Sequence, residues 1–419
     1  MSQSVHVSSE IAPLRRVIIH RPDAGIARIR PKRAEELLFD DIVHLPHMQE
    51  EHDIFRRVLE TFLGAENVLE SEQLLIEGLD HHAEYKQWII DKVVDYEELP
   101  DATRDRLLEL PNATLARVLI TGHDEEADAF LFDPIPNFIF TRDLAVTIND
   151  HVLITKASKE ARFRENYLTR FIVYAHPIFR GMEDAGRLIN LNFVNEFPPS
   201  RRGEYVGVEG GDVMILNKDY LLIGNSERTN QHGINSLKRA LFEQQVVDNV
   251  VQINIPADRS IMHIDTVFTH IDNDDLVCFK PLVMDGLASN VVVYRRNGTN
   301  QHYHSIAEFL RAEINPKMNF IYAGNGLSPY QEREQWTDGC NLVALRPGVG
   351  LTYDRNPHTE TAFRNAGYRI LHAKAFLEQV EAGTLDPSAV RKTIITLPSN
   401  ELSRARGGSH CVTCPIERA

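Results

Sequence analysis

A cysteine near the C-terminus is the residue best suited to covalent chemistry. Cys411 ends a glycine-rich, basic stretch, Arg-Gly-Gly-Ser-His-Cys, at residues 406–411. A thiol that attacks a substrate needs a proton shuttle and a polarised electrophile. Residues 209–212 (Glu-Gly-Gly-Asp) and 262–265 (Met-His-Ile-Asp) supply acids and a histidine. The sequence therefore predicts that Cys411 is a nucleophile and that distant segments bring its partners to it.

The acidic residues in these segments indicate the kind of substrate. His263 and Asp265 are two residues apart, which predicts that they share one face of a strand, where they suit proton transfer and cation binding. The glycines after Glu209 let the backbone approach a ligand closely. Several carboxylates around a thiol disfavour an anionic substrate and suit a planar cation with several N–H donors. The expected substrate therefore carries a guanidinium group.

The same acids should affect the thiol itself. Asp143, Asp265 and Glu209 are all expected near it. Their like charge opposes the thiolate of Cys411, whereas a protonated His263 favours it. Three carboxylates against one imidazolium predict a pKa above the ordinary ~8.5 of a cysteine. A bound guanidinium would pair with the acids and so promote ionisation of the thiol.

The small number of cysteines leaves two other sites to consider. Cys411 and Cys414 form a Cys-x-x-Cys pair, which also occurs in redox and zinc sites. A structural zinc would need a second ligand pair at matching spacing, but Cys278 and Cys340 stand alone. Four cysteines in 419 residues are too few for a disulfide framework. We therefore expect reduced thiols and no metal.

Four hairpin patterns recur along the chain, each with two short β-type runs across a turn. They open at Asp143, Asp212, Asp265 and Asn341. Helix-type stretches lie between them, for example at residues 234–245, 305–314 and 359–367. Such repeats cannot bury a sheet face alone, so they should close around a common axis and gather their opening polar residues at one end. The simpler alternative is that these residues only cap turns.

Residues 69–126 lack the hairpin pattern. Apolar residues recur at helical spacing in 69–78, 85–94 and 114–120, and Asp101 after a proline is a typical helix start. Nothing in this range has a chemical signature. We therefore expect a helical insertion with a role in structure or assembly.

The composition limits the partners. A formal net charge of −15 argues against sequence-independent binding to nucleic acid or to an anionic membrane, and it favours cationic ligands. The N-terminal residues contain no apolar segment of the signal type, and no apolar run approaches the ~20 residues of a membrane span. These features predict a cytoplasmic protein.

Seven motifs resemble those of the arginine deiminase family, in the family's order and over essentially the whole chain. They lie at residues 36–41, 137–143, 209–212, 226–229, 262–268, 333–336 and 406–415. The resemblance implies the α/β fold of the guanidine-modifying superfamily, a five-bladed pseudo-symmetric α/β propeller (pentein) with a small inserted helical domain. Residues 1–68 and 127–419 would form the catalytic propeller, and residues 69–126 the insertion.

The resemblance also implies catalytic roles. Cys411 resembles the nucleophile that attacks the guanidinium carbon. His263 resembles the acid and base that protonates departing ammonia and then activates water. Asp143 and Asp265 resemble the carboxylates that grip the guanidinium nitrogens, and Glu209 resembles the acid that orients the histidine.

Further positions resemble the family's substrate-binding residues. Arg162 and Arg228 match the side chains that hold the substrate carboxylate, helped by Asn137. The remaining matches wall or cover the pocket or stand beside the acids: Leu38, Phe140, Asp212 and Arg406. The chain departs from the family's usual motifs at Leu144, at residues 30–33 and at Ala405, and these departures concern the lid and fine substrate preference.

The implied reaction is hydrolysis of L-arginine to L-citrulline and ammonia through a thiouronium intermediate on Cys411, without a metal or organic cofactor, in a homo-oligomer such as a dimer or tetramer. The alternative is a related enzyme that acts on agmatine or methylated arginine, or an amidinotransferase. With agmatine, an arginine pair for an α-carboxylate would have no purpose. A third possibility is a binding or redox protein that uses Cys411 and Cys414, for which the acidic cluster would be irrelevant.

Overall fold

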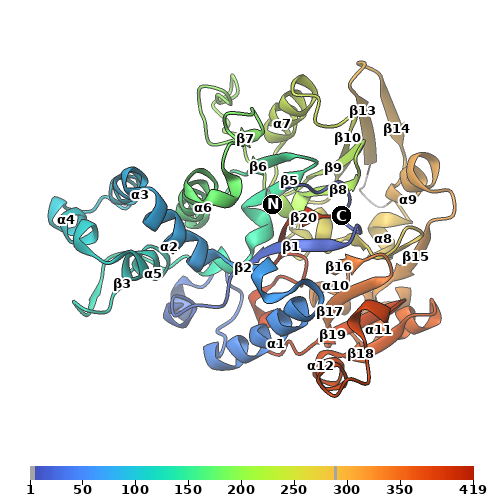
Figure 1. The fold of residues 1–419 in the computed structure, drawn as a ribbon. Helices are drawn as coiled ribbons and strands as arrows, with labels where there is room; N and C mark the ends of the chain where they lie inside the picture. The colour runs from blue at the N-terminus through green and yellow to red at the C-terminus, as the bar shows by residue number, and fades with distance from the viewer. Residues whose placement is uncertain (1–4, 287–289) are drawn as a thin grey trace.

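Five mixed β-sheets and their flanking helices make up most of this computed structural model (Figure 1). The structure describes residues 5–286 and 290–419 of the chain. A short hairpin of β3 (His123–Asp124) and β4 (Ala129–Phe130) forms a further, two-stranded sheet. The architecture is therefore mixed α/β, as the sequence predicts.

The five larger sheets share one strand pattern. Each sheet contains a triplet of neighbouring strands in which the middle strand is antiparallel to one neighbour and parallel to the other. In the order antiparallel neighbour, middle strand and parallel neighbour, the triplets are β5 (Ala145–Ile148), β6 (His151–Ile154) and β7 (Leu188–Asn190); β8 (Val213–Asn217), β9 (Tyr220–Asn225) and β10 (Asn249–Asn254); β11 (Phe268–His270), β12 (Asp275–Cys278) and β15 (Asn319–Tyr322); β16 (Val343–Arg346), β17 (Val349–Tyr353) and β19 (Thr393–Leu397); and β20 (Cys414–Arg418), β1 (Leu14–Ile19) and β2 (Val68–Glu70). The second sheet is extended by β13 (Asn290–Arg295) and β14 (Asn300–Tyr303), and the fourth by β18 (Arg369–His372).

The four predicted hairpins are confirmed as the first two strands of four sheets. In the β5–β6 turn, Asn149 has a φ of 52°, a left-handed conformation that asparagine tolerates better than most residues. The fifth sheet has no such hairpin, because it pairs β1 near the N-terminus with β20 at the C-terminus (Figure 1). No local turn signal can announce a pairing between the two ends of the chain.

The expectation that His263 and Asp265 share one face of a strand is wrong. Residues Ile264–Thr266 form a 3₁₀ turn, η10, and β11 begins only after it. A 3₁₀ helix has three residues per turn where a strand repeats every two, so the two side chains point in different directions. The acids that open the first two hairpins also end 3₁₀ turns, namely η5 (Thr141–Asp143) and η8 (Gly210–Asp212).

The range 69–126 is mainly helical, as expected, but its first two residues belong to strand β2 of the fifth sheet and residues His123–Asp124 form β3. It contains α2 (Ser71–His81), α3 (Ala83–Tyr96), α4 (Asp101–Glu109) and α5 (Asn112–Thr121), which lie to one side of the sheets, at the left of Figure 1. Leu75, Ile90 and Phe171 belong to one buried cluster, which joins these helices to α6 (Phe163–Ala175). The apolar faces of these helices are therefore buried against α6 and against one another.

Further helices flank the sheets. They are α1 (Leu45–Leu63), α7 (Gln231–Glu243), α8 (Lys280–Val283), α9 (Ile306–Phe309), α10 (Tyr330–Trp336), α11 (Pro357–Asn365) and α12 (Ala373–Glu381). The three expected helices are present as α7, α9 and α11, and α9 continues into a π-turn at Leu310–Ile314. Helix α7 begins earlier than predicted because the side chain of Asn230 caps it by accepting from Gly233 N. Within the described ranges, no helix is both long and apolar enough to cross a membrane.

Candidate active site

Five polar or nucleophilic residues stand just before the first strands of the five larger sheets. They are Asp143, Asp212, Asp265, Asn341 and Cys411, and each is at most 5% exposed. The sulfur of Cys411 lies 3.1 Å from Asn341 Nδ2 and 3.5 Å from Asp265 Oδ2. Asp143 Oδ1 accepts a hydrogen bond from the Gly211 N–H, next to Asp212, at 3.2 Å. The polar openings of the repeats therefore gather at one place, with the cysteine as a fifth member.

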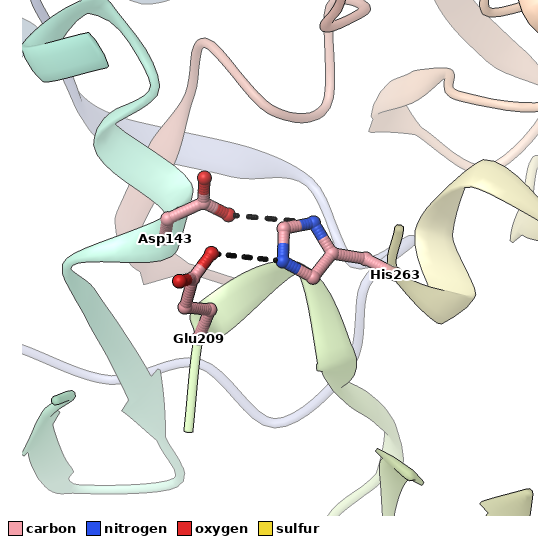
Figure 2. A group of neighbouring side chains, drawn as sticks. All are labelled: Asp143, Glu209 and His263. Carbon is pink, nitrogen blue, oxygen red and sulfur yellow. Dashed lines mark hydrogen bonds and ion pairs between the residues drawn. The ribbon is translucent and has the colours of Figure 1, made fainter. Parts of the chain in front are cut away.

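The ring of His263 faces two carboxylates, those of Asp143 and Glu209, as Figure 2 shows. Its Nε2 is 3.1 Å from Glu209 Oε2, and its Nδ1 is 3.9 Å from Asp143 Oδ1. Burial by itself would lower the pKa of His263, but Asp143, Glu209 and Asp212 outweigh it and raise the pKa to about 10. The histidine is thus an imidazolium at neutral pH and can donate a proton.

Glu209 is the partner that keeps this histidine charged. Burial would raise the pKa of Glu209, but its hydrogen bond with His263 and the charges of Arg228 and Arg162 hold it well below its usual range. The result is a buried ion pair in which the acid stays ionised. Such a pair is stable only because its charges are compensated in place.

The donor atoms of Asp143, Glu209 and His263 lie within 4.8 Å of one another, close enough to hold a metal ion. The two acids already have a cationic partner. Nη1 of Arg162 is 2.6 Å from Asp143 Oδ2 and 3.3 Å from Glu209 Oε2, and its Nε is 2.8 Å from Glu165 Oε2. We therefore interpret the group as a network of buried ion pairs and assign no metal to it.

The pKa of the Cys411 thiol is raised, as expected. Burial raises its pKa well above the ordinary value, and Asp265, Asp143 and Asp338 raise it further. The sequence pointed to Glu209 as the third acid, but Asp338 takes that place. Asp338 is a buried residue two positions beyond the motif at residues 333–336, and only the fold brings it near the thiol.

Asn341 holds the cysteine in place, a role that the sequence analysis did not assign. Its Oδ1 accepts the backbone N–H groups of His410 at 3.0 Å and Cys411 at 3.2 Å, while its Nδ2 contacts the sulfur. A Cβ on Gly408 would lie 2.6 Å from Asn341 Oδ1, which explains the glycine there. The only signal in the sequence was that Asn341 opens the fourth hairpin.

A second buried chain of polar groups supports Asp265 from behind. His410 Nδ1 is 2.9 Å from Asp265 Oδ2, and its Nε2 is 3.3 Å from Glu10 Oε2. Glu10 in turn pairs with Arg142 at 3.2 Å. The chain of Glu10, His410 and Arg142 was not predictable from the sequence, because nothing in their local sequences links these residues.

The three residues expected to hold a substrate carboxylate lie together near Glu209. Arg228 Nη1 is 3.6 Å from Glu209 Oε2, and Nη2 is 3.5 Å from Met262 Sδ. The carbonyl of Asn137 accepts from Arg162 Nη2 at 3.3 Å. Arg162 makes its closest contacts inside the acidic cluster, whereas Arg228 has only longer contacts. Arg228 is therefore the more available of the two guanidinium groups.

Phe140, one of the residues expected to wall the site, packs against Gly407 in the Gly-Gly segment before Cys411. A Cβ on Gly407 would lie 2.3 Å from the ring of Phe140, so only glycine fits against that ring. Asn137 Nδ2 donates to the carbonyl of Leu37 at 2.8 Å, which ties the site to the loop that carries half-buried Leu38. Leu38 itself has a left-handed φ of 62°.

Arg406 forms the outer contact of this segment. Its guanidinium stacks 3.3 Å over the ring of Trp336 and pairs with Asp40 at 3.3 Å, and Asp40 also binds Arg259 at 2.6 Å. A cavity of about 620 Å³ is lined by Asp40, Trp336 and Arg406 among others, but by neither Cys411 nor His263. Cys411 and His263 are each only 5% exposed, so the reacting groups are covered in this structure.

The fold is shared with enzymes of guanidino compounds. One similar solved structure is SxtG, an amidinotransferase of the saxitoxin pathway from Microseira wollei, with a TM-score of 0.52 at 13% identity over 99% of this chain and 97% of that chain. Another is the N-terminal domain of ArgZ, a cyanobacterial arginine dihydrolase, with a TM-score of 0.50 at 12% identity over 96% of this chain and 97% of that chain. At this identity the likeness establishes the fold alone.

The sequence comparisons identify the family. The arginine deiminase family model matches residues 35–123 and 107–418. The arginine deiminase of Limosilactobacillus fermentum is 34% identical over 443 aligned residues, and that of Pediococcus pentosaceus is 32% identical, in each case over 100% of this chain and 99% of the relative. The chain belongs to the arginine deiminase family.

Proposed function

We propose that this protein hydrolyses L-arginine to L-citrulline and ammonia, with Cys411 as the covalent nucleophile. The observation that carries the proposal is the position of its sulfur, 3.5 Å from Asp265, in a buried site where His263 is charged and paired with Glu209. Family membership over the full length of the chain supports the same reaction.

In the first half of the reaction, the guanidinium of arginine binds between Asp143 and Asp265, which accept from its nitrogens. The bound cation neutralises these acids, so the thiol of Cys411 loses its proton to solvent and becomes a thiolate. The sulfur forms a bond to the guanidinium carbon, and His263 gives its proton to one nitrogen. The C–N bond then breaks, ammonia leaves, and a positively charged thiouronium remains on Cys411.

In the second half, His263 is neutral and acts as a general base. It takes a proton from a water molecule, whose oxygen adds to the thiouronium carbon. The C–S bond then breaks, the added hydroxyl gives up its remaining proton to solvent, citrulline forms, and the thiolate of Cys411 returns. Glu209 keeps the imidazole oriented in both halves, and its charge stabilises the imidazolium that forms again.

Arg228 and Arg162 serve the α-carboxylate of the substrate in this proposal, with Asn137 beside them. Arg228 is the main ligand because its present contacts are long. Arg162 chiefly balances the acids that surround it. Phe140, Leu38 and Arg406 wall or cover the bound substrate.

The larger organisation follows the same resemblance. The repeated strand pattern supports the proposal that the five larger sheets are blades of a five-bladed pseudo-symmetric propeller. Residues 69–126 would be its helical insertion, and residues 1–68 and 127–419 the catalytic part. The four free, buried cysteines suit a reducing compartment such as the cytoplasm. A homo-oligomer, dimer or tetramer, is also part of the proposal.

A substrate comparison tests the function. The purified protein is incubated with L-arginine, agmatine or dimethylarginine, and the ureido product is measured in a colorimetric assay. We expect strong citrulline formation from arginine and weak reaction with the others, since only arginine combines a free guanidinium with an α-carboxylate. Equal turnover of agmatine, or transfer of the amidino group to an added amine without release of ammonia, would favour the sister enzymes instead.

A further inference from the structure

Asp212 is a fully buried acid whose two oxygens are both used within the protein. Oδ1 accepts the backbone N–H of Ile264 at 3.0 Å, and Oδ2 accepts the hydroxyl of Ser226 at 2.5 Å. The neighbouring strand leaves no room beside it, because a Cβ on Gly224 would lie 2.2 Å from Oδ1. This environment does not suit direct contact with a substrate, although the resemblance places Asp212 among the substrate-binding residues.

The bond to Ile264 reaches the proton shuttle. Ile264 directly follows His263, and the ring of His263 lies against Gly211, where a Cβ would be 2.6 Å from Nδ1. Gly211 directly precedes Asp212. Gly211 thus contacts the imidazole of His263, and Asp212 holds the backbone of Ile264, the next residue after the histidine.

The bond to Ser226 reaches the arginine that faces the substrate carboxylate. Ser226 Oγ accepts the backbone N–H groups of Arg228 at 3.0 Å and Thr229 at 3.1 Å. Thr229 Oγ1 accepts the backbone N–H of Glu209 at 3.2 Å. The turn that carries Arg228, and the acid that orients the histidine, are therefore both joined to Asp212.

We propose that Asp212 is a positioning residue that sets the places of His263 and Arg228 together, through Ile264 and Ser226, without touching the substrate. The proposal rests on the reaction proposed above and names the residue that coordinates proton transfer with recognition of the α-carboxylate. A displacement of about 1 Å in a reacting group costs on the order of 100-fold in rate, so this positioning has a measurable effect.

The hydrogen bonds at this position require a side chain with two acceptor oxygens. Ser226 Oγ already accepts two N–H groups, so its own hydrogen must point to Asp212 Oδ2. Oδ1 must accept from Ile264 at the same time. An amide has one acceptor oxygen and one donor nitrogen. Asp212→Asn therefore keeps the shape of the side chain. In either orientation of the amide, however, its NH₂ group faces another donor, which is the N–H of Ile264 or the hydroxyl of Ser226.

The test compares Asp212→Asn and Ser226→Ala with a matched control, Asp275→Asn. Asp275 is also a buried acid that accepts two hydrogen bonds, from Asn319 Nδ2 at 2.9 Å and from the Tyr368 hydroxyl at 2.8 Å. Lys392 Nζ lies 3.6 Å from it, and all these partners lie outside the reacting group. Steady-state kinetics with arginine and agmatine are measured for each protein. Circular dichroism and thermal unfolding verify that each variant is folded.

We expect kcat to fall about 100-fold with both substrates in Asp212→Asn, because His263 is displaced. KM should rise clearly for arginine and much less for agmatine, because agmatine lacks the group that Arg228 binds. Ser226→Ala should also lose the preference for arginine, whereas Ser226→Thr, which keeps the hydroxyl, should retain it. In Asp275→Asn, kcat and KM should stay within about threefold of the values for the original protein.

Two results would overturn the proposal. One is near-original kinetics in both Asp212→Asn and Ser226→Ala. The other is an equal rise of KM for arginine and agmatine with kcat unchanged, which identifies Asp212 as a direct guanidinium ligand. If the original protein forms no citrulline, the proposed reaction fails, but positioning is still tested by NMR. Ser226→Ala keeps the charge of Asp212 and should still shift the ring signals of His263, and unchanged signals would refute the role.

Discussion

The free protein should hold Cys411 mainly as a neutral thiol at neutral pH, and removing one acid should change this. Burial is the main cause that raises the pKa of this thiol, and Asp265, Asp143 and Asp338 follow. Asp265 is the acid to remove, because its Oδ2 is in contact with the sulfur at 3.5 Å. Asp265→Asn keeps the size of the side chain and deletes its charge.

The expected size of the effect follows from this distance. Two like charges 3.5 Å apart repel by about 5 kcal/mol at an effective dielectric constant of ~20. His410, 2.9 Å from the same oxygen, offsets part of this, and the cost of burying the thiolate remains. A net relief of roughly 1.4 kcal/mol or more corresponds to a tenfold or larger rise in the thiolate population at a fixed pH.

The assay is alkylation of Cys411 by neutral iodoacetamide as a function of pH, in a protein whose other three cysteines are replaced. The original site should titrate above the ordinary ~8.5 of a cysteine, and Asp265→Asn should react about ten times faster or more at pH 7. Asp275→Asn is the matched control and should leave the rate unchanged. A midpoint well below ~8.5 in the free protein would mean a pre-formed thiolate paired with His263, and the reasoning would be refuted.

Three further outcomes are expected. Cys411→Ser should fold but lose citrulline formation by several orders of magnitude, since the route needs a sulfur nucleophile, whereas Cys414→Ala should retain activity in the same colorimetric assay; the reverse pattern would assign the wrong thiol. Arg228→Ala should reduce the preference for arginine over agmatine about 10- to 100-fold in kcat/KM, because a charge-assisted bond to the α-carboxylate is lost, and an unchanged ratio would contradict that role. Burial would lower the pKa of His20, but two carboxylates 3.0 Å from its ring nitrogens raise it to about 10, so its stabilising effect is complete below about 6.5 and is lost as the pH rises through about 10. Thermal unfolding between pH 6 and about 10.5 should therefore show a decline in Tm that is smaller in His20→Gln, and equal declines would argue against this linkage.

The sequence determined the features that depend on near neighbours in the chain. The hairpins after Asp143, Asp212, Asp265 and Asn341 were predictable, because alternating apolar residues and polar turn residues act within a few positions. The helices of residues 69–126 followed from apolar periodicity in the same way. The acids, the histidine and Cys411 were also identifiable, because their chemistry resides in the residue type and the motif around it.

Only the tertiary structure decided which of these groups touch, and in what geometry. The sheet of β1 and β20 joins the two ends of the chain, and with it comes the chain of buried contacts from Glu10 through His410 to Asp265. Two more features were decided by the tertiary structure. Asn341 lies beside Cys411, and Asp338 is one of the acids that raise the pKa of the Cys411 thiol. Such contacts form between residues that are remote in sequence.

Arg162 shows the limit most clearly. The motif pointed to a ligand for the substrate carboxylate, but the fold sets its guanidinium 2.6 Å from Asp143 and 3.3 Å from Glu209. A buried carboxylate needs a cationic partner, and the sequence does not indicate which cationic side chain lies nearest to it in the folded protein. Sequence determined which groups the site contains, and packing decided how their charges are paired, because charge compensation in a buried site depends on distances that only the folded chain fixes.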